Sequence, residues 1–77
     1  MIKAYILVVA NPGATKQVFE ALQQVKGVTK CSQVMGPYDI VVEIEVEDLA
    51  DVPPILGSHI RTIEGVENTT SLVTFPD

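Results

Sequence analysis

The sequence predicts one α+β domain in which a four-stranded antiparallel sheet carries two helices on the same face. Three features of the 77 residues support this prediction. Residues 2–10 are apolar on both faces of an extended strand, and apolar residues alternate along residues 40–46, as they do in a strand with one buried face. Each of these runs is followed by apolar residues at helical spacing. The whole pattern then occurs twice, and the second copy lies 38 residues after the first.

The first predicted strand is residues 2–10, IKAYILVVA. Its apolar side chains occupy both faces: Ile2, Ala4, Ile6, Val8 and Ala10 on one, and Tyr5, Leu7 and Val9 on the other. A strand that is apolar on both faces is covered on both, so we expect it in the centre of the sheet. The Asn-Pro-Gly sequence at residues 11–13 ends the strand because these residues favour a turn.

The first helix is predicted to run from Ala14 to Lys26. Its apolar stripe consists of Ala14, Val18, Ala21, Leu22 and Val25. Gly27 lies just beyond the last turn, where glycine favours a helix stop. Residues 28–35 return to an extended pattern and predict the second strand, which leads into a Gly-Pro turn.

The second half begins with a strand at residues 40–46. Its core face is Ile40, Val42, Ile44 and Val46, and its acidic face carries Glu43, Glu45 and Glu47. Asp48 is placed to cap a second helix. Prolines at positions 53 and 54 are tolerated only near a helix start, so the regular helix is expected to begin near Val52. We expect Gly65 to end this helix and residues 67–75 to form the last strand.

The repeat predicts the topology. A shift of 38 residues places Ile2, Ala4, Ile6 and Val8 on Ile40, Val42, Ile44 and Val46, and Gly27 on Gly65. Each half is therefore β-α-β, and the chain is β-α-β-β-α-β, the ferredoxin-like split arrangement. Right-handed crossovers put both helices on one face of the sheet.

The other face of the sheet, with Tyr5, Leu7 and Val9, is predicted to lie bare in a monomer. A contiguous apolar patch of this kind usually marks an interface. A domain of 77 residues also has a small core, which association commonly supplements. We therefore expect a homodimer in which two sheets pack face to face.

Composition excludes several classes of partner. The net charge is −5 and the five basic residues are scattered, whereas nucleic acid requires clustered cations, so we expect no direct nucleic-acid binding. The longest apolar run, residues 4–10, is too short to span a membrane. A single cysteine, Cys31, excludes an intrachain disulfide framework. With no signal peptide, this composition favours the cytoplasm.

Catalytic chemistry has little support in the sequence. His59 is the only histidine, and it lies at the flank of the second helix. Cys31 has no base beside it in sequence, so we expect an inert thiol. Residues 43, 45 and 47 are acidic, but three acids on one strand do not close around a metal ion and are better explained as a solvated face. We expect no enzyme activity, no metal and no cofactor.

The central turn, residues 35–40 with the sequence MGPYDI, is the best candidate for a ligand site. Gly36 exposes peptide groups, Tyr38 offers an apolar wall with a polar tip, and Asp39 is able to hold an ammonium group. The hydroxyls of Thr69, Thr70 and Ser71 are further hydrogen-bonding groups. The competing explanation is ordinary turn chemistry at Asp39 and strand propensity at the threonines.

Two stretches carry a resemblance to a known family. Residues 36–42, GPYDIVV, and residues 63–73, IEGVENTTSLV, resemble the C-terminal effector-binding domain of the Lrp/AsnC (feast/famine) transcription regulators. That family has G-x-Y/F-D before an apolar strand, then a helix ending in G-V, then a Thr-rich strand. Residues 24–28, QVKGV, fit the end of its first helix. The resemblance covers essentially the whole chain, 1–77, as a single domain.

The resemblance implies an α/β sandwich that dimerises through its sheets, with dimers assembling into rings that are commonly octamers. It implies a small effector, usually an amino acid, between dimers near the central turn. Carried over by position, Gly36, Tyr38 and Asp39 contact the amino-acid head group, and residues 69–71 reach a neighbour's site. No helix-turn-helix precedes the domain, so it resembles a stand-alone effector module. Its effect on transcription is then expected to pass through another protein, such as a full-length regulator.

Two other functions stay open at this point. Dimeric ferredoxin-like barrels include small monooxygenases and isomerases, and fold alone does not exclude them. Their sites need polar groups between helices and sheet, where this chain has mostly aliphatic residues. The third possibility is a purely structural assembly module. The leading hypothesis is a sensor of amino acids or related metabolites.

Overall fold

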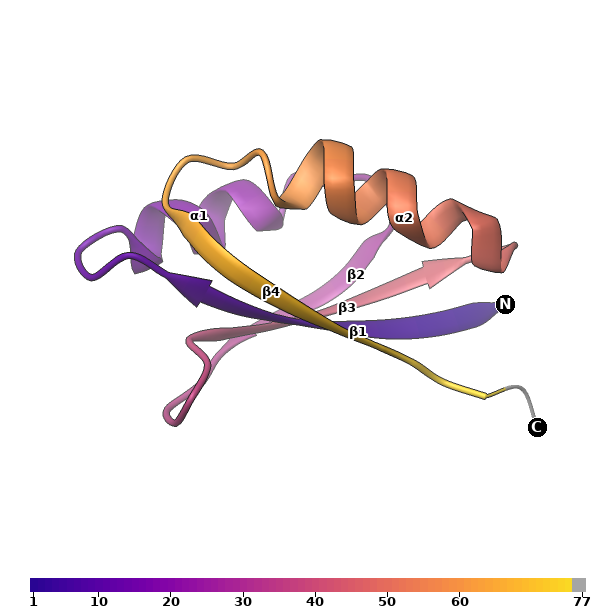
Figure 1. Cartoon of the computed structure of the whole chain (residues 1–77), viewed down its shortest axis with the longest axis horizontal. Coiled ribbons are helices and arrows are strands. Elements are labelled where there is room, and N and C mark those ends of the chain that lie inside the picture. The colour runs from indigo at the N-terminus through magenta and orange to yellow at the C-terminus, as the bar shows by residue number, and fades with distance from the viewer. Residues whose placement is uncertain (76–77) are drawn as a thin grey trace.

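The computed structural model describes residues 1–75 of the chain. Along the sequence lie β1 (Ile2–Ala10), α1 (Thr15–Leu22), β2 (Val28–Gln33), β3 (Ile40–Val46), a helical segment built of η1 (Leu49–Asp51), α2 (Val52–Pro54) and η2 (Ile55–Ile60), and β4 (Val66–Val73). This is the predicted β-α-β-β-α-β order. Both helical segments lie on the same side of the sheet (Figure 1). The ferredoxin-like α+β fold is confirmed.

The sheet has the order β2-β3-β1-β4, and its three pairs are antiparallel. The two strands with the most continuous apolar sequence, β1 and β3, are the central pair. In the middle of the sheet Ile6 lies opposite Val42 on one side and Ser71 on the other. A central strand is paired along both edges, and both of its faces are available for packing. This explains why β1 has apolar side chains on both faces.

The core lies between the sheet and the helices. Its buried apolar residues alternate along the two central strands and are joined by two from each helical segment: Ala4, Ile6, Val8, Ala10, Val18, Leu22, Ile40, Val42, Ile44, Val46, Val52 and Ile60. The predicted core faces of the strands are confirmed. Leu56 and Ile63, four residues before and three residues after Ile60, are half-buried against this core.

The first helix is shorter than predicted, because α1 ends at Leu22 rather than near Lys26. Beyond this point the amides of Gln24 and Val25 donate to carbonyls three residues earlier, at 3.1 and 3.2 Å. Such bonds tighten the chain into single turns and end the regular α-helix. Val25 still packs against the core, so the apolar periodicity continues where the helix does not.

The second helical segment begins with a capping box. The side chain of Asp48 accepts from the Ala50 amide, and the side chain of Asp51 accepts from the Asp48 amide. Regular helix starts at Val52, as predicted from the two prolines. The next six residues, Ile55–Ile60, form a π-helix, in which the Arg61 amide donates to the Leu56 carbonyl at 2.9 Å.

The remaining strands differ from prediction at their ends. β2 ends at Gln33, two residues before the predicted end, although the Val34 amide still donates to the Asp39 carbonyl. β4 begins at Val66 and ends at Val73 instead of covering residues 67–75. The chain stays attached beyond β4, since the amide and hydroxyl of Thr74 both donate to the Lys3 carbonyl at 3.0 and 2.8 Å.

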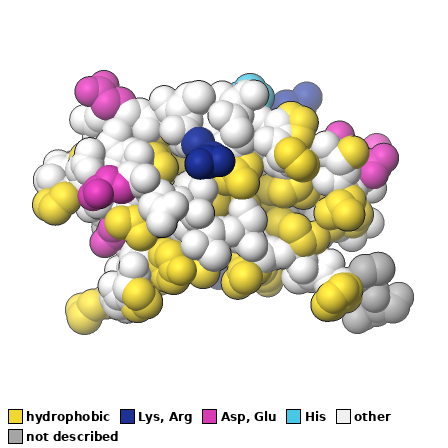
Figure 2. All heavy atoms as spheres, in the orientation of Figure 1, with side chains coloured by type: hydrophobic (Ala, Val, Ile, Leu, Met, Phe, Trp, Pro, Cys, Tyr) yellow, Lys and Arg dark blue, Asp and Glu magenta, His cyan; other side chains and the backbone are white. Residues whose placement is uncertain are grey.

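The face of the sheet turned away from the helices, here called the open face, carries the side chains of Tyr5, Leu7 and Val9, which are half-buried. Hydrophobic side chains lie along the lower margin of the molecule in Figure 2, where Figure 1 places the sheet. In the described part of the chain, no helix has the length and apolar character needed to cross a lipid bilayer.

Candidate functional site

The central turn connects β2 to β3 and projects from the sheet on the side opposite the helices (Figure 1). Gln33 pairs with Ile40, and the Val34 amide donates to the Asp39 carbonyl at 2.9 Å, so the two strands form the predicted hairpin. Gly36 has φ +144°, a conformation that L side chains rarely adopt, and no atom lies within 4 Å of the place a Cβ would take. The peptide groups of Gly36 are therefore open to an approaching molecule.

Asp39 fastens the turn to the first strand. Its amide donates to the Val8 carbonyl at 2.9 Å, and its Oδ2 accepts from the Ala10 amide, also at 2.9 Å. The carboxylate thus satisfies a backbone donor just past the last pair of β1 and β3, Val8 with Ile40. The sequence indicates a ligand's ammonium or the local backbone of the turn as partners of this carboxylate. It gives no sign of Ala10, because nothing in it shows that the turn closes on a strand 29 positions away.

Tyr38 joins the turn to the far edge of the sheet. Its hydroxyl donates to Oγ1 of Thr70 at 3.3 Å. Because β1 lies between β3 and β4 in the sheet, the half-buried phenol must cross β1 to reach this threonine. The structure therefore brings two of the predicted site residues together.

The three hydroxyls of β4 do not gather at one place. Thr70 lies opposite Leu7, on the open face. Thr69 and Ser71 lie opposite Val8 and Ile6, whose side chains belong to the helix-covered core. Because successive side chains of a strand point to opposite faces, Thr69 and Ser71 are on the side of the sheet away from the Tyr38–Thr70 bond.

The open face continues from this bond toward the other end of the sheet. Leu7 lies between Val41 and Thr70, and Tyr5 lies between Glu43 and Leu72. The apolar surface of the predicted interface is thus directly next to Tyr38 and Thr70. The candidate ligand residues and the candidate dimer residues form one continuous surface.

An ion pair occupies the far end of the open face, where Lys3 Nζ lies 3.1 Å from Glu43 Oε1. The hydrogen bond to Glu43 and its negative charge raise the pKa of Lys3 above its ordinary value. The predicted acidic row of the third strand is therefore partly neutralised within the chain.

His59 and Cys31 are the single histidine and the single cysteine of the chain. His59 is exposed on η2, and Cys31 is half-buried on β2, where burial raises the pKa of its thiol. Within residues 1–75, no group of three histidine, cysteine or acidic side chains is arranged to hold a metal ion.

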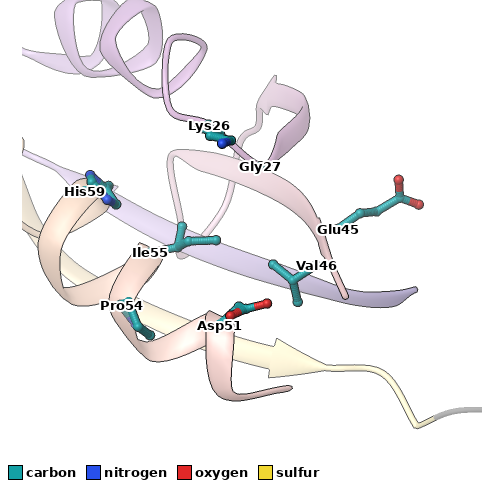
Figure 3. Close-up of a pocket in the computed structure, with 8 residues that line it drawn as sticks. All are labelled: Lys26, Gly27, Glu45, Val46, Asp51, Pro54, Ile55 and His59. Atoms are coloured by element: carbon teal, nitrogen blue, oxygen red, sulfur yellow. The ribbon is translucent and has the colours of Figure 1, made fainter. Parts of the chain in front are cut away.

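The structure also contains a hollow of about 390 Å³, and it does not lie at the central turn. It is placed at the other end of β3, between the loop before β2 and the second helical segment (Figure 3).

Comparison with known sequences agrees with the family resemblance noted in the sequence. A family model described as the Lrp/AsnC ligand binding domain matches residues 3–76. An uncharacterized HTH-type transcriptional regulator of Pyrococcus horikoshii is 34% identical over 74 residues, which are 95% of this chain and 47% of the relative. The chain thus spans about half the length of such regulators. A homocitrate synthase of Sulfolobus acidocaldarius is 35% identical over 60 residues, but these are only 13% of that enzyme.

Solved structures agree. A crystal structure of a Thermus thermophilus protein superposes with a TM-score of 0.95 at 28% identity, covering 100% of this chain and 96% of that one. A feast or famine regulatory protein from M. tuberculosis, complexed with L-methionine, has a TM-score of 0.82 at 20% identity. That match covers 100% of this chain and 52% of the regulator.

Proposed function

Because the chain belongs to the Lrp/AsnC ligand-binding domain family, we propose that it is a sensing module that binds an amino acid or related small effector and responds through its assembly. The observation that carries this proposal is the family match over residues 3–76 together with the position of the central turn. The turn lies beside the open face, so a ligand there adjoins the surface through which copies associate. Ligand binding and association would then be thermodynamically linked, because the ligand favours the assembly that completes its binding site.

The proposed site comprises Gly36, Tyr38, Asp39 and Thr70. The carboxylate of Asp39 would attract the ammonium group of an amino acid while Oδ2 keeps its bond to Ala10. The Tyr38 hydroxyl and Thr70 offer a donor and acceptor pair that a ligand can join or replace. Thr69 and Ser71, on the other side of β4, would serve a neighbouring copy. A relative of the same fold was solved with L-methionine, which supports the choice of ligand class.

The proposed assembly is a homodimer formed by two open faces, with Tyr5, Leu7 and Val9 at its centre. The apolar residues of this face have no covering layer within the described chain, whereas the other face has the helices. Dimers would associate further through the turns, up to an octamer.

The route to transcription is proposed to run through a partner. These 77 residues carry a net charge of −5, which disfavours contact with DNA. A regulator of the same family with a DNA-binding domain would share the assembly with this chain in the cytoplasm. Chemistry on the effector is not part of the proposal, because the described residues near the turn include no assembled nucleophile and base.

Calorimetry with the common amino acids tests the proposal, with assembly size followed by light scattering. We expect at least one amino acid to bind and to change the assembly. Asp39→Asn removes the negative charge but keeps an oxygen for the Ala10 amide, so it should weaken binding about tenfold or more without unfolding the chain. If no amino acid binds or changes the assembly, the sensor hypothesis fails and the structural assembly module replaces it.

A further inference from the structure

The two halves of the chain are alike in sequence, but their outer strands pair with the central strands in different registers. Where β2 pairs with β3, Gln33 lies opposite Ile40. The 38-residue shift would place Ser71 of β4 opposite Ile2 of β1, but Ser71 is opposite Ile6. β4 is therefore displaced by four residues along β1 relative to the arrangement of β2 on β3.

The displacement brings the loop before β4 against the end of β1 and the first helix, and it closes that corner of the molecule. The Gly65 carbonyl, just before β4, accepts from the Asn11 amide at 2.8 Å, beyond the end of β1. At Gly65 a Cβ would lie only 2.9 Å from Val18 Cγ2 and 3.0 Å from Ala14 Cβ of the first helix region. The loop, the strand end and the helix are in direct contact there, and no space remains.

The equivalent corner of the other half stays open. The Gly27 carbonyl accepts from the Glu45 amide at 3.1 Å, and Glu45 still lies inside β3. The loop before β2 therefore stops short of the start of the second helical segment. A Cβ on Gly27 would lie 3.3 Å from Cδ1 of Ile55 in that segment. The hollow of about 390 Å³ occupies the space that results, and we call it the corner hollow.

The helix over the corner hollow also departs from regular geometry. Pro53 and Pro54 lack amide donors, and the segment that follows is the π-helix Ile55–Ile60. A π-helix is wider than an α-helix and appears frequently at functional sites. The corresponding part of the first half is the regular α-helix Thr15–Leu22. The irregular helix and the open corner thus occur together.

The lining of the corner hollow combines an apolar floor with charges of both signs. Val46 and Ile55 point toward its centre in Figure 3, and the Glu45 carboxylate turns outward. Lys26 lies on one side and Asp51 on the opposite side, with His59 on η2 as a further hydrogen-bonding group. Its volume falls within the range of small-molecule sites, roughly 300–1,000 Å³.

We propose that the corner hollow is a second ligand site, separate from the central turn, and that it takes a small zwitterion with an apolar side chain. The carboxylate of the ligand would face Lys26 and His59, its ammonium group would face Asp51, and its side chain would contact Val46 and Ile55. A simple anion would meet the Asp51 carboxylate and a simple cation would meet Lys26. Only a molecule with both charges matches both walls.

Calorimetric titration of the whole chain with the common amino acids tests this. The amino acid with the clearest heat is then compared in Lys26→Glu and in Lys16→Glu, which makes the same change of charge on the exposed surface of α1. We expect affinity for the corner hollow to fall about tenfold or more in Lys26→Glu and to be unchanged in Lys16→Glu. Asp51→Asn, which keeps an oxygen for the Asp48 amide, should also weaken binding.

Two further measurements separate this site from the one at the turn. Tyr38→Phe alters the turn and should leave binding at the corner hollow unchanged. The decarboxylated amine and the deaminated acid of the same amino acid each carry one charge, and both should bind about tenfold or more weakly. Binding that is lost in Tyr38→Phe but kept in Lys26→Glu would overturn the second site and leave the proposed function intact. Absence of any binding would overturn both.

Discussion

Asp39 has a structural partner in addition to its proposed ligand. Its Oδ2 accepts from the Ala10 amide at 2.9 Å, where the two central strands part. An amide of a buried residue such as Ala10 costs free energy when it loses its acceptor, whereas an amide side chain at position 39 would still accept this bond. The residue therefore links the stability of the fold to the geometry of the candidate site.

This dual role gives a prediction for a pair of variants. Asp39→Ala should lower the free energy of unfolding by about 1–3 kcal/mol, because the Ala10 amide is left unpaired. Asp39→Asn should lower it by less than about 1 kcal/mol. Urea unfolding at one fixed protein concentration measures both. Equal losses in the two variants would show that the bond to Ala10 does not contribute.

At the scale of elements, the junction between the second helical segment and β4 depends on a glycine in a crowded place. Gly65 has φ +102°, and the space for its Cβ is taken by Val18 and Ala14. Gly36 has φ +144°, but the space around it is empty. Both positions have a backbone conformation that would strain an L residue, but they differ in crowding, so together they separate these two effects.

Gly65→Ala should therefore destabilise the chain more than Gly36→Ala does. Backbone strain alone costs about 1–2 kcal/mol at each position, and overlap with Val18 and Ala14 adds to it only at Gly65. Thermal unfolding of the two variants at matched concentration provides the comparison. A similar loss at both positions would mean that α1 moves away from the loop at little cost.

The elements themselves were largely predictable from the sequence. The period-two pattern located the central strands, the helical spacing located the first helix, and Asp48 and Pro53 marked the start of the second helical segment, because these signals act locally. The early end of α1 at Leu22 was not predictable, since Val25 keeps the apolar period while the backbone changes to tighter turns.

The candidate site was less predictable than the elements. The Tyr38–Thr70 bond depends on how far β4 slides along β1, and register is a property of the assembled sheet. For the same reason the sequence placed residues 69–71 together, and the strand separates Thr70 from its two neighbours. The corner hollow depends on the same register and had no signal in the sequence beyond the two prolines.

At the scale of the whole molecule, the buried residues are on one side only. All twelve buried apolar residues of the described chain belong to the layer between sheet and helices. Leu7 and Val41 face the other way and are half-buried by their neighbours in the sheet. A second copy would give the open face the covering layer that its apolar side chains favour.

Leu7→Lys should therefore convert the proposed dimer to a monomer, because a charge in the middle of the interface would lose its hydration. Gln17→Lys, on the exposed side of α1, makes a charge change away from that face and should leave the dimer unchanged. Light scattering across a dilution series measures the assembly. A stable dimer in Leu7→Lys would place the interface elsewhere.

The long-range pairing of β4 with β1 also has a consequence for biosynthesis. Thr74 bonds to the Lys3 carbonyl across 71 positions of the chain, so the sheet closes only after the chain has left the ribosome as far as Thr74. Until then the edge of β1 that accepts β4 is unpaired, and an unpaired apolar edge promotes aggregation. The nascent chain is therefore vulnerable to aggregation in the interval when the first three strands are outside the ribosome and β4 is still inside the exit tunnel.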